Sequence, residues 1–384
     1  MNPHLHYDFR DILIAPARAL SAKRIFVMTL FLCVGLVVYD ACTYLAVALD
    51  GEKVGTFWNI YGLAPVTLFY FDHLAAQIVY AVGVALGVLA LMLGFFGVAS
   101  IEIEQVRGNR FFSIPGAIAF TLRRFTQLLI SEVSIIAFMA VILVLFLLLG
   151  LVTRIPFIGE YIYALTFLLP AFVIAIFTVF IFAVFQISIV LLPATAAAER
   201  NGEAFTAILE TFSTIVRQPV RWLLYTAYGL LTAKVCSFVY AYFCYRSVQF
   251  IGWAVSLSGG ANADTMIRGG LSHLPLRSDL VREMLNVFPG VDFSFSISHL
   301  VQPMTGNPAG HVMALMLFMI FASVVGYALS VVATAQARGY VVIRYLKDEY
   351  RIADERPLFL EEETPVEEHT PPTDQHDPED STDN

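Results

Sequence analysis

The chain has 384 residues, of which 58% are hydrophobic and only 14% charged, and its mean hydropathy is +0.73. These values exclude an ordinary soluble domain, because several apolar runs exceed the roughly 18 residues typical of a membrane span. The net charge of -8 arises at the C-terminus, where residues 357–384 hold ten acidic residues and no Lys or Arg. The remaining chain, with 23 basic and 21 acidic residues, is nearly neutral. The composition therefore predicts an all-α polytopic transmembrane bundle.

Six apolar segments predict six spans. They cover about residues 25–48, 74–99, 132–153, 170–193, 221–245 and 311–336. The first resembles a signal peptide, but it is too long for one and Asp40 interrupts it, so we interpret it as an uncleaved span. Residues 1–347 are then a transmembrane domain. The acidic, Pro-rich residues 348–384 have too few apolar side chains to form a core and are predicted to be a disordered tail.

Three amphipathic segments precede spans one, three and five, at about residues 8–22, 116–130 and 203–217. Each is apolar on one helical face but too short to cross a bilayer about 30 Å thick, so we expect helices at the membrane interface. In the third segment, Thr214 is assigned to the polar face. Phe125 and Phe212 are the predicted interfacial anchors, and we expect Phe212→Asp to be far more damaging than Thr211→Asp.

Basic residues favour the cytoplasmic side in short loops. Starting at the N-terminus, alternate segments hold four, four, three and five basic residues, whereas the loops between them hold one, one and four. The loop with four, residues 256–309, is long, and long loops weigh less in this rule. Both termini and the three surface helices are therefore predicted to be cytoplasmic, with loop 256–309 outside. Short matches between the surface segments leave open whether the chain is three copies of a two-span unit.

The region around residues 185–224 has a distinctive order of features. A long span ends at Pro193, an acidic patch AERNGEAF follows, then a surface helix AFTAILETFS, and then a basic-Pro-basic passage into the next span. With the RIPFIG turn before it, this order resembles a family of uncharacterised bacterial polytopic membrane proteins and, more distantly, the membrane domain found beside bacterial glycerophosphodiester phosphodiesterases. The resemblance covers roughly residues 95–260. It implies a bacterial inner-membrane location and the fold, and it implies no activity.

Two features inside the spans stand out. Small residues recur on one stripe of span two, which is typical of close helix packing; they are Gly83, Gly87, Ala90, Gly94 and Gly97. Asp40 in span one and Lys234 in span five lie at similar expected depths, so they are a candidate intramembrane ion pair. The alternative is that Lys234 snorkels to the outer interface while Asp40 reaches water.

The sequence shows no motif for catalysis, cofactor binding or metal binding. It has no HExxH motif and no phosphate-binding loop after a strand, and its four cysteines form no CxxC pair. We therefore expect no enzyme, no cofactor and no nucleic-acid partner. The favoured hypothesis is a non-enzymatic scaffold or assembly factor associated with lipid, with a protein partner for the acidic tail or outside loop. The alternative is a transporter or channel that uses the Asp40 and Lys234 region.

Overall fold

The computed structural model describes residues 5–63, 65, 69–109, 111–259, 266–267, 269–270, 274 and 308–358. These residues form helices and connecting turns, with no β-strand among them. The elements are α1 (Arg10–Leu13), α2 (Ala15–Ala19), α3 (Ala22–Leu49), α4 (Val54–Tyr61), α5 (Leu74–Val106), α6 (Ile114–Arg123), α7 (Phe125–Val152), α8 (Ile158–Thr166), the π-helix η1 (Phe167–Ala171), α9 (Phe172–Ala198), α10 (Ala204–Arg217), α11 (Pro219–Gly259), α14 (Pro308–Asp348) and the 3-10 helix η3 (Ile352–Asp354).

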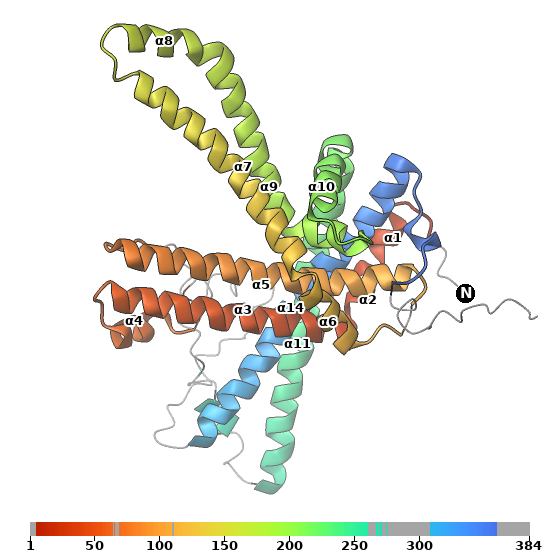
Figure 1. The fold of residues 1–384 in the computed structure, drawn as a ribbon. Coiled ribbons are helices and arrows are strands. Elements are labelled where there is room, and N and C mark those ends of the chain that lie inside the picture. Colours follow the sequence, from red (N-terminus) through yellow and green to blue (C-terminus); the bar gives the residue numbers. More distant parts are fainter. Residues whose placement is uncertain are drawn as a thin grey trace, which may run out of the picture.

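Among the described residues, six helices are long and apolar enough to cross a membrane: α3, α5, α7, α9, α11 and α14. This confirms the predicted all-α, six-span architecture. Consecutive spans form three hairpins, α3–α5, α7–α9 and α11–α14, which diverge from one shared end of the molecule (Figure 1). Helix α14 also contacts α3, α5 and α9, so it joins the three hairpins near that end.

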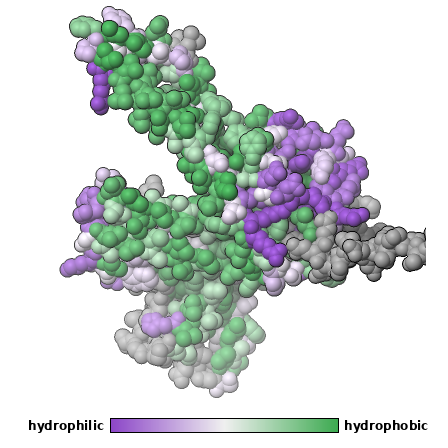
Figure 2. All heavy atoms as spheres, in the orientation of Figure 1, coloured by the Kyte–Doolittle hydropathy of each residue, from purple (hydrophilic) through white to green (hydrophobic). Residues whose placement is uncertain are grey.

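The shared end also holds most of the main hydrophobic core. Side chains from the last turns of α5 and α9 meet those of α14 there, including Phe96, Ile101, Leu192 and Tyr340. Hydrophilic side chains gather on the surface of the same end, whereas the hairpins leading away from it are largely hydrophobic (Figure 2). The fold is therefore a polar, well-packed end from which three apolar hairpins extend.

The small residues of α5 lie against α3. A Cβ atom added at Gly97 would come within 2.7 Å of Val27 Cγ1, one at Gly94 within 2.9 Å of Met28 Sδ, and one at Gly87 within 3.4 Å of Tyr39 Cβ. A Cβ at Gly83 would overlap the Cβ of Cys42, and Ala90 is buried beside Gly35. Since side chains are this small along the contact, the two backbones approach closely over most of the length of the hairpin.

Several span boundaries differ from the prediction. The third span begins at Phe125 and not near residue 132, because the chain breaks its helix at Arg124, whose guanidinium donates to the carbonyls of Glu199 and Arg200 after α9. The predicted surface helix 116–130 is therefore divided between α6 and the start of α7. Pro193 does not end the fourth span, since α9 continues to Ala198. The last two spans are longer than predicted, and loop 256–309 lies outside the described residues except at its two edges and a few isolated positions.

The predicted surface helix 203–217 forms as α10, but its faces are used differently. Thr211 and Thr214 are buried against the bundle, with Thr211 Oγ1 2.9 Å from Thr195 Oγ1 of α9. Phe205, Leu209 and Val216 are exposed, and Phe212 is half-buried. The assignment of Thr214 to the polar outer face was therefore wrong, and Thr211 is unsuitable as a surface control. Threonine methyl groups pack in such contacts while their hydroxyls bond back to the helix backbone, as Thr211 does to Ala207.

The C-terminal segment after α14 is partly ordered. Residues 349–358, which were predicted to belong to the disordered tail, return across the end of α5, and Ile352 of η3 is buried in the main core. Ile352, Ala353 and Leu358 are few and irregularly spaced in a polar stretch, so they give no periodic signal and the sequence did not reveal this contact. Residues 359–384 lie outside the described part of the chain. At the other terminus, the predicted helix 8–22 is split into α1 and α2 at Ile14.

The close contact between α3 and α5 makes Gly83 intolerant of any side chain. We expect Gly83→Ala to reduce the free energy of unfolding by about 1–3 kcal/mol, because the new methyl group overlaps Cys42. The two helices are closely packed and cannot move apart without losing other contacts. Gly150 of α7 is the matched control, since nothing lies within 4 Å of its Cβ position. There, Ala should be neutral or stabilising by up to about 1 kcal/mol. Thermal unfolding in detergent measures both, and equal effects would contradict the described helix contact.

Candidate functional site at the polar end

The helices and turns at the shared end form one surface, which we call the platform. It consists of α1, α2, α6, α10 and residues 349–358, together with the adjoining ends of α5, α9 and α14 (Figure 1). Its outer surface is mostly hydrophilic (Figure 2). Three groups of buried or half-buried ion pairs join its parts, and each group is described in turn below.

Glu102 is the first group's centre. This carboxylate near the end of α5 is completely buried, and it contacts three arginines. Arg338 of α14 donates through Nε at 2.6 Å, Arg24 of α3 donates through Nη2, and Arg18 of α2 lies 3.6 Å away. Arg338 also donates to the carbonyl of Asp11 at 2.8 Å. One carboxylate thus connects two spans and the N-terminal helices to α5.

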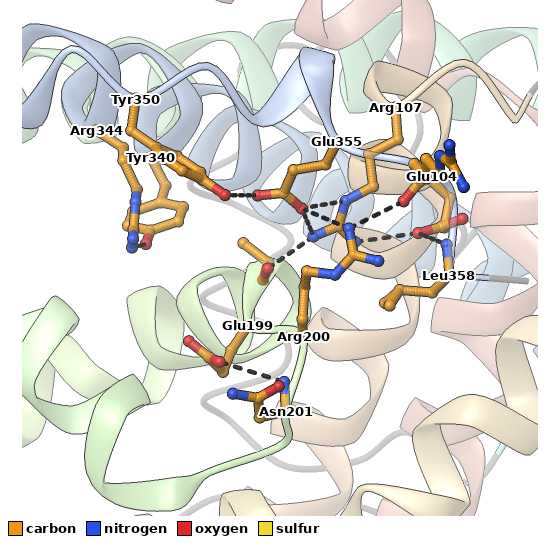
Figure 3. Close-up of polar contacts among 12 residues, drawn as sticks. Glu104, Arg107, Glu199, Arg200, Asn201, Tyr340, Arg344, Tyr350, Glu355 and Leu358 are labelled. Atoms are coloured by element: carbon orange, nitrogen blue, oxygen red, sulfur yellow. Dashed lines mark hydrogen bonds and ion pairs between the residues drawn. The ribbon is translucent and has the colours of Figure 1, made fainter. Parts of the chain in front are cut away.

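Arg107 is the centre of the second group (Figure 3). Its fully buried guanidinium donates to Glu104 at 3.1 Å, to the carbonyl of Ala198 at 2.7 Å and to Glu355 at 2.5 Å. Tyr350 donates to the same Glu355 carboxylate at 2.7 Å, and this hydrogen bond raises the pKa of Tyr350. Arg107 therefore joins the C-terminal segment to the ends of α5 and α9, and Arg200 and Glu104 add contacts to the backbone of Arg356 and Leu358.

The third group joins α10 to the end of α14. Glu210 Oε2 accepts from Lys347 Nζ at 2.8 Å and lies 3.1 Å from Arg344 Nη1. Arg217 lies 3.3 Å from Asp348. Together with Arg124, which holds the α9–α10 turn and whose pKa is lowered by burial, these contacts fix α10 in place. The charged atoms of the platform thus act mainly between its own elements.

The platform's outer surface carries exposed apolar side chains beside charged ones. The apolar residues that are more than half exposed include Phe9, Leu20, Phe111, Leu122, Phe205, Leu209 and Val216. Arg10 and Arg217 expose about two thirds of their side chains, 67% and 62%. A surface with both kinds of side chain suits contact with a membrane interface or a protein partner.

The residues singled out in the sequence lie in separate places. Asp40 is buried in α3, whereas Lys234 is exposed on α11. The ion pair between them, and ion coupling through it, stay predictions from the sequence. Phe125 begins α7 and packs partly against the main core, and Phe212 packs partly against the core between α9 and α10.

The sequence analysis missed the residues that organise the platform. Glu102, Glu104 and Arg107 follow an apolar run in the stretch IEIEQVR, and their charge places them by pattern at a solvated span end. Arg338 follows the apolar part of α14 and precedes the charged residues Arg344 and Lys347, so its sequence position also indicates a span end. Glu132 was also missed; it is the one ionisable residue in α7 and is buried. Across the described residues, no group of three or more His, Cys, Asp or Glu side chains is placed to hold a metal.

Comparison with protein families, with curated proteins and with solved structures finds no match to this chain. The resemblance drawn from residues 95–260 thus remains an expectation from the sequence. The geometry of the platform and the hydropathy of the spans are therefore the basis for any functional conclusion.

The contact between Glu355 and Arg107 should control whether residues 349–358 stay on the bundle. Glu355→Gln removes a charged acceptor from a buried arginine, a loss of about 1.5–3 kcal/mol in local stability. We expect trypsin to cleave after Arg351, which is followed by Ile352, faster in this variant than in the wild type. Glu349→Gln changes an exposed carboxylate in the same segment and is the control. Identical cleavage rates in the two variants would show that the contact does not hold the segment.

Proposed function

We propose that this protein is a non-enzymatic membrane scaffold or assembly factor that presents the platform to a protein partner at the surface of the lipid bilayer. The observation that carries the proposal is the rigid platform itself. Buried ion pairs centred on Glu102 and Arg107 fix short helices that would be marginal alone, while its outer surface keeps exposed apolar and charged side chains.

Rigidity matters for a scaffold because a surface that is already ordered loses little conformational entropy when a partner binds. Helix α10 illustrates this, since contacts to α9 and α14 fix its inner face and leave Phe205, Leu209 and Val216 outside. These side chains would rest at the membrane interface or against the partner. The acidic residues 361–383, which follow the docked C-terminal segment, would attract a basic partner surface.

The proposed setting is a bacterial inner membrane with the platform and both termini in the cytoplasm. The distribution of basic residues in the sequence supports this orientation, since the segments next to the platform hold four, four, three and five of them. The resemblance to uncharacterised bacterial membrane proteins supports the choice of membrane. Within this proposal the distant similarity to a phosphodiesterase-associated membrane domain concerns the fold alone.

The orientation can be tested with reporter fusions. A reporter after Asn384 should be active only in its cytoplasmic form, and one inserted within residues 262–275 only in its external form. The reason is that one further span, α14, separates the two positions. Two reporters on the same side of the membrane would contradict the topology. An external reporter after Asn384 with a cytoplasmic one within 262–275 would place the platform on the external side.

The scaffold role can be tested by photo-crosslinking in cells. A photoreactive residue at Arg10 or Phe205 of the platform should yield one discrete protein adduct, identified by mass spectrometry. The control is Leu147 of α7, which is 61% exposed but far along an apolar hairpin, and it should yield lipid adducts. The proposal fails if the platform positions also give lipid adducts alone, or if platform and hairpin positions give the same proteins.

A further inference from the structure

Glu132 is buried where no charged group can balance it. It belongs to α7, about 10 Å from the start of the helix at 1.5 Å per residue, and only 8% of the residue is exposed. Its neighbour across the helix contact is Ser188 of α9, which is fully buried. Neither α7 nor α9 has another ionisable side chain.

The charged groups on the other packed elements are engaged elsewhere. On α10, Glu210 contacts Lys347 and Arg344, and Arg217 contacts Asp348. On α5, Glu102 and Glu104 contact arginines. On α14, the charged side chains that contact α10 and α5 are the lysine and arginines already named, and Arg124 before α7 donates to backbone carbonyls. Among the described residues no basic side chain pairs with Glu132.

The two hydrogen-bond contacts of Ser188 bear on the protonation state of this carboxyl group. Ser188 Oγ lies 2.8 Å from Glu132 Oε1 and 2.7 Å from the carbonyl oxygen of Phe185. A serine hydroxyl has one hydrogen to donate, and a backbone carbonyl can only accept. A separate hydrogen atom for each of the two contacts is available only if the carboxyl group carries a proton. Glu132 then donates through Oε1 to Ser188, and Ser188 donates to Phe185.

The second carboxyl oxygen of Glu132 also favours the protonated form. Glu132 Oε2 is buried and has no hydrogen-bond partner among the described atoms. In an ionised carboxylate this oxygen would carry part of a full charge without any donor, which is very costly in an apolar interior. In the protonated group it is an ordinary carbonyl oxygen, and the cost of leaving it unpaired is smaller.

We propose that Glu132 is a proton-binding site in the contact between α7 and α9, and that its protonation is coupled to the packing of these two helices. Binding forms an O–H bond at Oε1, and release transfers the proton to water and leaves a carboxylate between the helices. Ser131 directly precedes Glu132, and Gln127 lies about one turn nearer the platform than Ser131, with its amide 3.4 Å from the carbonyl of exposed Glu203. The proposal does not depend on the scaffold function.

Infrared spectroscopy of the purified protein tests the protonation state directly. The wild type at neutral pH should show the C=O stretch of a protonated carboxyl group, and Glu132→Gln should lose it. The same band should disappear as the pH is raised. The amide of the variant has the shape of the protonated acid and can donate to Ser188, so this variant should fold. A wild-type spectrum that does not differ from the variant in this band at any pH would overturn the proposal.

A second measurement needs no variant. An apolar carbodiimide adds to protonated carboxyl groups in apolar surroundings, and mass spectrometry locates the adduct. We expect label on Glu132 that declines as the pH rises, and none on Glu102, which is also buried but contacts three arginines. Label on both glutamates, or label on Glu132 that is independent of pH, would contradict a titrating site.

The proposed coupling predicts a pH-dependent stability. Ionising Glu132 is easier in the unfolded chain than between the helices, so wild-type stability should fall as rising pH removes the proton. The melting temperature of Glu132→Gln should not show this fall. Glu160→Gln changes an exposed carboxylate in α8 and should behave like the wild type. If the wild type and Glu132→Gln follow the same pH profile, the proton is not coupled to the helix packing.

Discussion

The contact of Glu102 with three arginines is the interaction on which the arrangement of the chain depends. It joins α5 to α3, α14 and the N-terminal α2 at one buried point. Removing water from four charged groups is expensive, and the mutual attraction only offsets that cost when the geometry is good. Such a cluster adds less to stability than its charges suggest. Its main consequence is specificity, because any other register of these helices would leave an arginine buried without its carboxylate.

Away from the platform, the α3–α5 and α7–α9 hairpins differ in how closely their two helices pack. The α3–α5 hairpin is packed closely along its length, since Gly83, Gly94 and Gly97 let the backbones approach. The α7–α9 hairpin lacks such a stripe, and most of its large side chains away from the platform are exposed, including Leu147 and Phe177. Bulky apolar side chains pack no better against another helix than against lipid chains. We therefore expect this hairpin to be positioned mainly by its platform end, through Glu132, Ser188 and α10.

The sequence was sufficient for the parts of the fold that follow from the bilayer. Hydropathy and length predicted six spans and the helix at 203–217, because a helix must satisfy its own backbone hydrogen bonds in lipid. The sequence was insufficient where a single residue determines where a helix starts or which of its faces is buried. The start of α7 depends on Arg124 reaching the carbonyls of Glu199 and Arg200, and the inner face of α10 depends on Thr211 fitting against Thr195. Neither contact leaves a periodic pattern in the sequence.

Two buried glutamates in this molecule show how the same side chain takes opposite roles. Glu102 lies among three guanidinium groups, so its charge is needed there and a proton would leave the arginines uncompensated. Glu132 lies against a serine hydroxyl and apolar helices, so its charge has no counterpart and a proton is needed instead. A neighbouring cation and a bound proton are two ways to reduce the free-energy cost of burying a carboxylate in an apolar environment. Only protonation changes with pH in the physiological range, because the arginines remain charged throughout it. The ion pairs around Glu102 therefore hold the platform together over the whole physiological pH range. The α7–α9 hairpin, which has little close packing away from the platform, instead contains Glu132, the carboxyl group that can gain or lose a proton in that range.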